Sequence, residues 1–297
     1  MKPTVFIHTN AQQLLGAKIS AYSLQRASAN SDKFDVQIIE LEKYPHLNNR
    51  DGQTFLRNGE KVIYRRDELQ SFTLLRYMPP SLMNFEGRAV VVDPDIFAVG
   101  DVHELLSRDM GGKAIMARSA KNGRGYATSS MLMDCEKLQH WQWEKQIDDL
   151  FALKRDYQPW IVLELEPPET VGSFEEEWNH FDTLNEKTKL LHNTRRTTQP
   201  WKTGLPFEDL HHIAQGATKA GLKSRVKTLF GKTQTHEEHP DTKQRDLFFG
   251  LLRECLDKGV VTKEFLQAEI DRKYLRPDAF NVLESTNAKA NLASLGA

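Results

Sequence analysis

The sequence predicts an α/β domain over residues 1–207, followed by a helical region over residues 208–297. Two observations support this prediction. Short runs of β-branched and aromatic residues alternate with helical patterns up to about residue 205, which is typical of a parallel or mixed sheet covered by helices. From about residue 208 the strand signals disappear, and helical patterns dominate to about residue 286. The length of 297 residues is also that of about two domains.

The elements of the first eighty residues follow this alternation. Val5–Ile7 has the residues of a buried strand, Leu14–Leu24 places apolar groups at helical spacing, and Phe34–Leu41 is a second candidate strand. Residues 44–62 are rich in Asn, Asp, Gly and Arg, which predicts a loop with a hairpin. Asp67–Met78 is helical in pattern and is expected to stop at the two prolines that follow it.

A continuous apolar run marks the centre of the predicted sheet. Ala89–Val92 contains only Ala and Val, as expected for a strand covered on both faces. Asp101 and Glu104 have the spacing of a capping box before a short helix. Further strands are expected at Lys113–Ala117, Ser129–Asp134 and Trp160–Leu165, with a helix around Trp141 and Trp143.

The composition is that of an ordinary globular protein. The 40 basic residues are balanced by 41 acidic ones, and this net charge of -1 argues against nucleic acid as a partner of the whole chain. Two cysteines are too few for a disulfide framework. No run approaches the roughly 18 apolar residues that a membrane span requires. We therefore expect a cytoplasmic protein, attached at most to the inner face of a membrane.

Two carboxylates follow the predicted central strand. Asp93 and Asp95 flank Pro94, whose ring stiffens the turn. Ligands of open α/β sheets bind beyond the carboxyl ends of strands, and two carboxylates at this spacing can converge on one hard divalent cation. Such a cation can neutralise a departing diphosphate. A pair of solvated loop aspartates would show the same spacing.

Four segments, in order, resemble retaining glycosyltransferases related to glycogenin and the lipopolysaccharide galactosyltransferases, known as family 8. Residues 87–106 resemble the family's metal-binding segment, in which a strand ends in Asp-x-Asp and a Gly-Asp pair precedes a helix. The other three segments are Phe72–Leu82, Tyr126–Asp134 and Leu190–Trp201. The resemblance covers roughly residues 3–206. It implies a GT-A fold, a UDP-linked sugar donor, retention of configuration, and bound Mn²⁺ or Mg²⁺.

The resemblance also implies roles for single residues. Asp93, Asp95 and His192 would hold the metal, and this mixed oxygen and nitrogen set suits Mn²⁺ better than Ca²⁺. The diphosphate and donor sugar would meet four basic residues, which are Arg76, Arg195, Arg196 and Lys202. The base would contact Thr9 and Asn10, and the candidates for the acidic pair beside the donor sugar are Asp156 and Gln158. Each has a plainer alternative, such as helix capping for Asn10 or a core position for His192.

The chain departs from the family pattern at several places, since its late segment is one residue longer and has Arg195 and Arg196 about where glycine is expected. Thr128-Ser129-Ser130 stands where the family has Asn-Ser-Gly, and Gln199 stands where it has lysine. Two other functions therefore stay open. One is a non-catalytic protein that binds a nucleotide-sugar or a partner, and the other is a haloacid-dehalogenase-type phosphatase with Asp93 as nucleophile. Trp178 and Asn179 either line the acceptor side or pack in the core.

Residues 217–232 predict a basic amphipathic helix. They contain five basic residues and no acidic one, arranged around an apolar stripe. Such a helix can lie on an anionic membrane or dock on the α/β domain. The acceptor, whether a glycan, a lipid-linked sugar or a protein, does not follow from the sequence.

Overall fold

The computed structural model describes residues 1–120, 123–207 and 234–285. The helix expected over residues 217–232 lies outside this part of the chain. Within the described residues, no helix combines the length and apolar character needed to cross a membrane.

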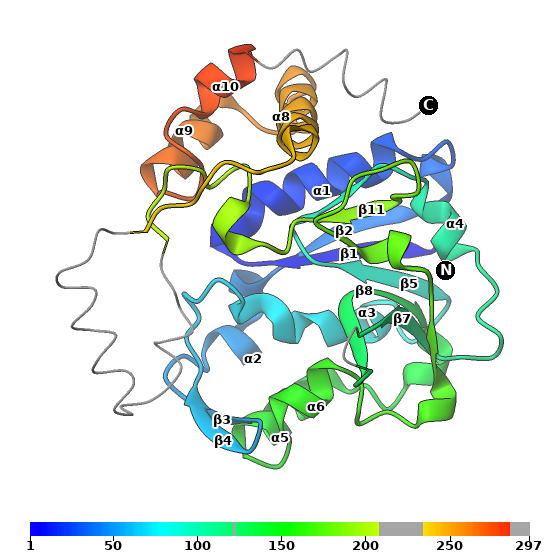
Figure 1. The fold of residues 1–297 in the computed structure, drawn as a ribbon. Helices are drawn as coiled ribbons and strands as arrows, with labels where there is room; N and C mark the ends of the chain where they lie inside the picture. The colour runs from blue at the N-terminus through cyan, green and yellow to red at the C-terminus, as the bar shows by residue number, and fades with distance from the viewer. Residues whose placement is uncertain (121–122, 208–233, 286–297) are drawn as a thin grey trace.

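A six-stranded mixed sheet forms the centre of the fold, in the order β2-β1-β5-β8-β7-β9 (Figure 1). β1, β2 and β5 run parallel to one another, β8 is antiparallel to both β5 and β7, and β9 is parallel to β7. The strands are β1 (Thr4–Thr9), β2 (Asp35–Glu40), β5 (Arg88–Val92), β7 (Ile115–Ser119), β8 (Tyr126–Asp134) and β9 (Val171–Ser173). The expected α/β class is confirmed, with the Ala-Val run of β5 near the middle of the sheet.

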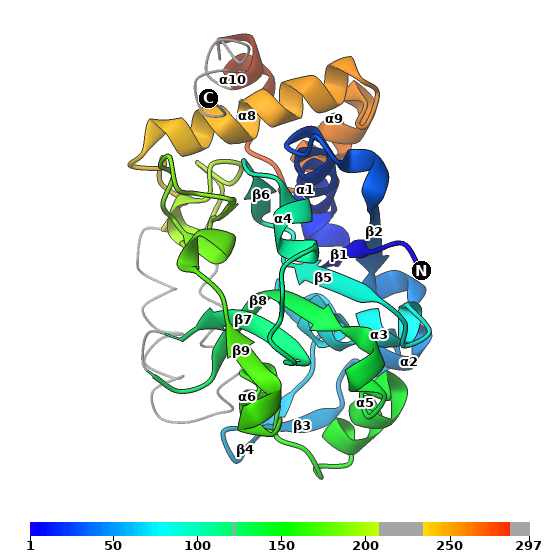
Figure 2. The ribbon, with the colours of Figure 1, turned by 90° about the vertical axis from the view of Figure 1, so that its right-hand side faces the viewer.

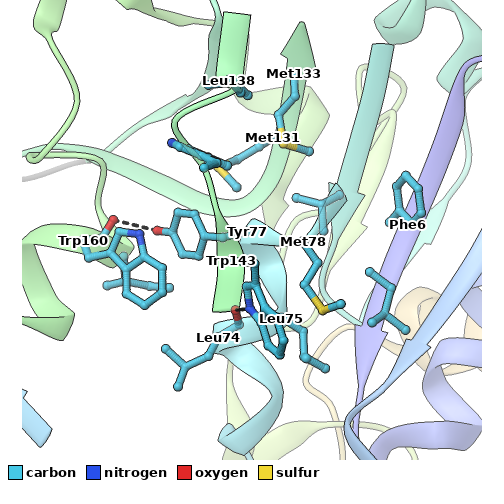
Figure 3. Close-up of a cluster of buried hydrophobic side chains, with 14 of the residues drawn as sticks. Phe6, Leu74, Leu75, Tyr77, Met78, Met131, Met133, Leu138, Trp143 and Trp160 are labelled. Atoms are coloured by element: carbon cyan, nitrogen blue, oxygen red, sulfur yellow. Dashed lines mark hydrogen bonds between the residues drawn. The ribbon is translucent and has the colours of Figure 1, made fainter. Parts of the chain in front are cut away.

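Both faces of the sheet are covered, which explains the continuous apolar run Ala89–Val92 of the central strand β5. On one face, Val5 and Ile7 of β1 pack with residues of α1 (Leu14–Arg26) and α4 (Val102–Leu106). On the other, Phe6 belongs to a cluster with Leu75, Met131 and three tryptophans, which are Trp141, Trp143 and Trp160 (Figure 3). There the Tyr77 hydroxyl donates to the Trp160 carbonyl oxygen at 2.6 Å, and Trp143 Nε1 donates to the Leu74 carbonyl oxygen at 2.8 Å.

A smaller sheet brings a late segment of the chain to the end of β5. It consists of β10 (His180–Phe181), β11 (Leu190–His192) and β6 (Ile96–Ala98), with β11 antiparallel to β6. His192 stands opposite Ile96 in this register. The register therefore places His192 beside the Asp93-Pro94-Asp95 turn, about 100 residues away in sequence.

The hairpin expected within residues 44–62 is present. β3 (Thr54–Arg57) pairs with β4 (Glu60–Ile63) around Asn58 and Gly59, whose positive φ angles of 54° and 76° suit a tight hairpin turn. The Asp156 carboxylate accepts from the backbone N–H of Asn58 at 3.0 Å and of Gly59 at 2.6 Å. This carboxylate fastens the hairpin to α6 (Tyr157–Ile161).

Two expected elements differ in the structure. The strand predicted over Trp160–Leu165 is wrong, because its first residues belong to α6, which Asp156 caps by accepting from the Gln158 N–H at 2.9 Å. A short apolar run does not distinguish a buried helix from a strand. The helix expected over Asp67–Met78 is instead the 3₁₀-helix η4 (Ser71–Tyr77), and the two prolines begin α3 (Pro79–Leu82) because proline fits a first helical turn.

The C-terminal helices share one core with the α/β domain. α8 (Thr242–Asp257), α9 (Lys263–Asp271) and α10 (Ala279–Ser285) pack over α1 and β6 (Figure 2). The Trp201 and Phe248 rings stack with their centroids 4.8 Å apart. The other helices are α2 (Pro45–Asn48), α5 (Trp143–Phe151) and the short 3₁₀ turns η1 (Ala11–Gln13), η2 (Ser31–Lys33), η3 (Leu41–Lys43), η5 (Cys135–Leu138), η6 (Pro168–Thr170), η7 (Glu176–Asn179) and η8 (Arg196–Thr198).

Candidate metal and nucleotide site

Asp93, Asp95 and His192 come together at the carboxyl end of β5. Asp93 follows β5, Asp95 precedes β6, and His192 ends β11. One ligand atom of each residue lies within 4.8 Å of the other two. His192 Nε2 is 3.2 Å from Asp95 Oδ1. Two carboxylate oxygens and one imidazole nitrogen at this spacing can share one divalent cation.

The turn that carries the two carboxylates is held on three sides. The Asp93 N–H donates to the Ser129 carbonyl oxygen of β8 at 2.9 Å, and the Asn193 N–H donates to the Asp95 carbonyl oxygen at 3.2 Å. On the third side, α1 approaches closely at Gly16, where a Cβ atom would lie 2.6 Å from the Pro94 carbonyl oxygen. The close approach of α1 therefore requires glycine at residue 16.

The orientation of His192 suits a metal ligand. Asn179 Nδ2 donates to Ser129 Oγ at 2.9 Å and to the Ala127 carbonyl oxygen at 3.2 Å. These bonds turn Asn179 Oδ1 toward His192 Nδ1, which lies 2.9 Å away. The network thus assigns the proton of the neutral ring to Nδ1 and leaves the lone pair of Nε2 facing the aspartates. A polar partner on the second nitrogen is what orients most metal-binding histidines.

Two nitrogen-bearing side chains lie against the Asp93 carboxylate, Arg76 of η4 and His8 of β1. Arg76 Nη2 donates to Asp93 Oδ1 at 2.5 Å, and Nη1 donates to Thr128 Oγ1 at 2.8 Å. His8 Nε2, on β1, lies 2.9 Å from the same carboxylate oxygen. Burial alone would raise the pKa of Asp93, but Arg76 and His8 hold it well below its usual range. Asp93 is therefore ionised at neutral pH.

The two aspartates act on His192 in turn. Burial alone would lower the pKa of His192, but the adjacent Asp95 carboxylate, with Asp93 further away, raises it above its usual value. The site therefore favours positive charge next to the two carboxylates, as a cation site must.

A cavity of about 340 Å³ opens from this centre. One wall contains the three candidate ligands with Arg76 and Arg196, and we call it the metal wall. A second part of the lining is formed by Arg57 of the hairpin with Tyr157 and Gln158 of α6, and we call it the hairpin wall. The remaining lining residues are Gln13, Leu69, Gln70, Phe72, Thr73, Tyr126, Ala127, Thr128, Ser129, Ile161, Val162, Thr194 and Gln199.

The structure brings only part of the predicted residue set into this cavity. Arg76, Arg196 and Gln158 line it together with the three candidate ligands. Thr9 and Asn10 do not line it, and both are buried. Asn10 Nδ2 donates to the Glu68 carbonyl oxygen at 3.0 Å and to Ser71 Oγ at 2.9 Å.

The other three predicted residues also lie outside the cavity lining. The Asp156 carboxylate caps α6 and holds the hairpin. Arg195 is exposed, and its N–H donates to Asp182 Oδ1 at 3.1 Å. Lys202 is buried over the Tyr274 ring, 5.5 Å from its centroid, and burial lowers the pKa of its ammonium to about 8.

Sequence reasoning missed two contributors to the site. His8 is fully buried, and the signal for it was a histidine that directly continues the apolar run of β1. Asn179 received no role at the metal, because its link to His192 depends on a contact between η7 and β11 that sequence spacing does not show. Gln199, noted as a departure, donates to Asp95 Oδ2 at 3.2 Å.

Comparison with known proteins gives similar solved structures only. The chain is similar to the glycosyltransferase GlyE of Streptococcus pneumoniae TIGR4, with 15% identity and a TM-score of 0.48 over 88% of this chain and 64% of that one. It is also similar to the galactosyltransferase LgtC in complex with donor and acceptor sugar analogs, with 12% identity and a TM-score of 0.45 over 77% of this chain and 97% of that one. For mouse xyloside xylosyltransferase 1, the identity is 13% and the TM-score 0.40, over 66% of this chain and 99% of that one.

These similar structures are all glycosyltransferases, as the resemblance in the sequence led us to expect. The chain spans just under two thirds of the length of GlyE. No family model matches the sequence, and no curated protein matches it. At these TM-scores the likeness does not by itself indicate a reaction, so the case for a function has to come from the site.

Proposed function

We propose that the chain is a metal-dependent glycosyltransferase that moves a sugar from a nucleotide-sugar, UDP-linked, to an acceptor with retention of configuration. The observation that carries the proposal is the convergence of Asp93, Asp95 and an oriented His192 in a cavity that Arg76 and Arg196 also line. Retention and the UDP donor follow from the resemblance of the sequence to family 8.

The residues present fit a divalent cation. Asp93 Oδ, Asp95 Oδ and His192 Nε2 would hold Mn²⁺ or Mg²⁺, and Asn179 would keep the ring in the required orientation. When bound, the ion would supply Lewis-acid stabilisation of the leaving diphosphate.

The chain's own residues would mainly position the donor. Arg196 can reach a diphosphate from the loop after β11, while Arg76 holds Asp93 in place through its bond to Oδ1. Gln158, at the start of α6, can donate to or accept from hydroxyls of the donor sugar. Binding both substrates in one cavity lowers the entropic part of the barrier.

The test is release of nucleoside diphosphate from a panel of UDP-sugars, with and without Mn²⁺. Many transferases hydrolyse their donor slowly without acceptor, so wild-type protein is expected to release UDP from at least one donor. Asp95→Ala should release none, while Asp32→Ala, an exposed aspartate outside the cavity, should behave as wild type. Metal-dependent binding of donor without any release would favour the non-catalytic binder instead.

A further inference from the structure

The residues that line the cavity carry more positive charge than the proposed function would neutralise. The charged lining residues are three arginines and two aspartates, apart from His192. The three arginines and a divalent cation together carry five positive charges. The two aspartates neutralise two of these, and the two phosphates of a bound diphosphate neutralise one each. One positive charge is left over. This count rests on the proposed function.

Arg57 on the hairpin wall is the residue without a counter-charge. Arg57 as a residue is half-buried. Its guanidinium lines the cavity and forms no ion pair or hydrogen bond with the described part of the chain. Glu60 stands opposite it in the hairpin register, but no ion pair joins the two. Glu68 feels both Arg57 and Arg196, yet burial dominates and raises the pKa of its carboxyl. A half-buried cation without an acidic partner in a concave site is suited to an anion brought by a ligand.

The side chain is also held in position. Its guanidinium carbon lies 5.1 Å from the centroid of the Tyr157 ring. This cation–π contact uses none of the guanidinium N–H groups as hydrogen-bond donors, so they can still donate to a ligand. Tyr157 is itself fixed, since its hydroxyl is 3.1 Å from Thr73 Oγ1 and its ring meets Phe55 edge-on at 5.8 Å. Asp156 secures the hairpin beside it.

We propose that Arg57, supported by Tyr157, binds a carboxylate or phosphate group on the carbohydrate substrate, so that the enzyme prefers an acidic sugar. The planar fork of arginine matches either anion. The Tyr157 ring and Gln158 beside it offer an apolar face and an amide to the sugar itself. The hairpin wall is then the part of the cavity that sets substrate specificity.

The anion can belong to the donor sugar or to the acceptor, and two titrations separate these sources. The first compares UDP-glucuronate with UDP-glucose in the presence of Mn²⁺. The second titration is done with UDP and Mn²⁺ at saturation. It compares the affinities for two acidic ligands, the methyl glycoside of glucuronate and glucose 6-phosphate, with the affinity for neutral methyl glucoside. We expect the acidic member to bind about tenfold more tightly in one of the two titrations.

Arg57→Gln should abolish that preference and leave the affinity for the neutral member unchanged. Arg57→Lys should retain part of it, and Arg65→Gln, an exposed arginine outside the cavity lining, should retain all of it. UDP binding without a preference in either titration would overturn this inference alone. Failure of wild-type protein to bind UDP at all would overturn the proposed function and this inference with it.

Discussion

The two walls of the cavity are built differently. On the metal wall, the candidate ligands are held by polar partners from separate elements, as Asp93 is by Arg76 of η4 and His8 of β1. On the hairpin wall, the Arg57 guanidinium contacts the Tyr157 ring and forms no ion pair or hydrogen bond within the described residues. Figure 1 shows β11 and the β3–β4 hairpin on opposite sides of β1 and β5. We infer that the metal wall is organised by polar bonds for a cation, and that the hairpin wall presents an unpaired cation to the substrate.

Removing a ligand from the metal wall should give the largest effect. His192→Ala deletes the only nitrogen donor of the three and is expected to weaken Mn²⁺ binding by more than about 100-fold, which exceeds the usual effect of an outer partner. Calorimetric titration of Mn²⁺ measures this. His140→Ala, a histidine outside the cavity, is the control. Wild-type affinity in His192→Ala would remove this residue from the site.

Loss of the orienting partner should have an intermediate effect. In Asn179→Ala the ring of His192 loses its nearer partner on Nδ1, at 2.9 Å, and is left with Ser129 Oγ at 3.3 Å. Mn²⁺ affinity is expected to fall by about 10- to 100-fold. At a pH above the raised pKa of His192, nitrogen NMR of the neutral imidazole should show one tautomer in the wild-type protein and a mixture in the variant. Asn30→Ala, whose amide donates to Asp101 outside the cavity, serves as control. A single unchanged tautomer would show that Asn179 only packs.

Lys202 should have the smallest effect on the site and a measurable one on stability. Burial lowers its pKa from 10.5 to about 8. Below pH 8 the folded chain holds a buried ammonium, and this penalty disappears as the pH rises toward 10.5, because the unfolded chain then binds more protons. Wild-type stability should therefore increase from this source between pH 8 and 10.5.

The variant Lys202→Met should remove that pH dependence and add up to about 3 kcal/mol at pH 7, as measured by urea unfolding at both ends of the range. Nucleotide affinity should stay within about twofold of wild type, since Lys202 does not line the cavity. Lys187→Met, an exposed lysine, controls for loss of charge. A large fall in nucleotide affinity would instead give Lys202 the diphosphate role that the resemblance implies.

The metal wall could be predicted from sequence to a greater extent than the hairpin wall. An Ala-Val run that ends in Asp-Pro-Asp predicts both a buried strand and its carboxyl end, so the place of Asp93 and Asp95 in the site follows from the local sequence pattern. His192 was reached only through the resemblance, and its orientation by Asn179 depends on tertiary contacts. The domain boundary at residue 207 stays a prediction, although α8 and α1 share a core.

The hairpin wall depends on contacts that no local pattern contains. α6 was mistaken for a strand because Trp160 and its neighbours are apolar, while the Asp156 cap that starts the helix was assigned to chemistry instead. Arg57 has no motif around it. Its place in the cavity follows from the fastening of the hairpin by Asp156, which only the folded chain shows.

The most direct test of the central claim is a thermal-shift panel of nucleoside diphosphates, each with and without Mn²⁺. At about a hundred times its dissociation constant, a ligand should stabilise the fold by about 2.7 kcal/mol. We predict that one nucleoside diphosphate stabilises the protein only with Mn²⁺, that Asp95→Ala abolishes the shift, and that Asp32→Ala keeps it. No shift with any nucleotide, or a shift that survives Asp95→Ala, would contradict a metal-dependent nucleotide site at Asp93, Asp95 and His192.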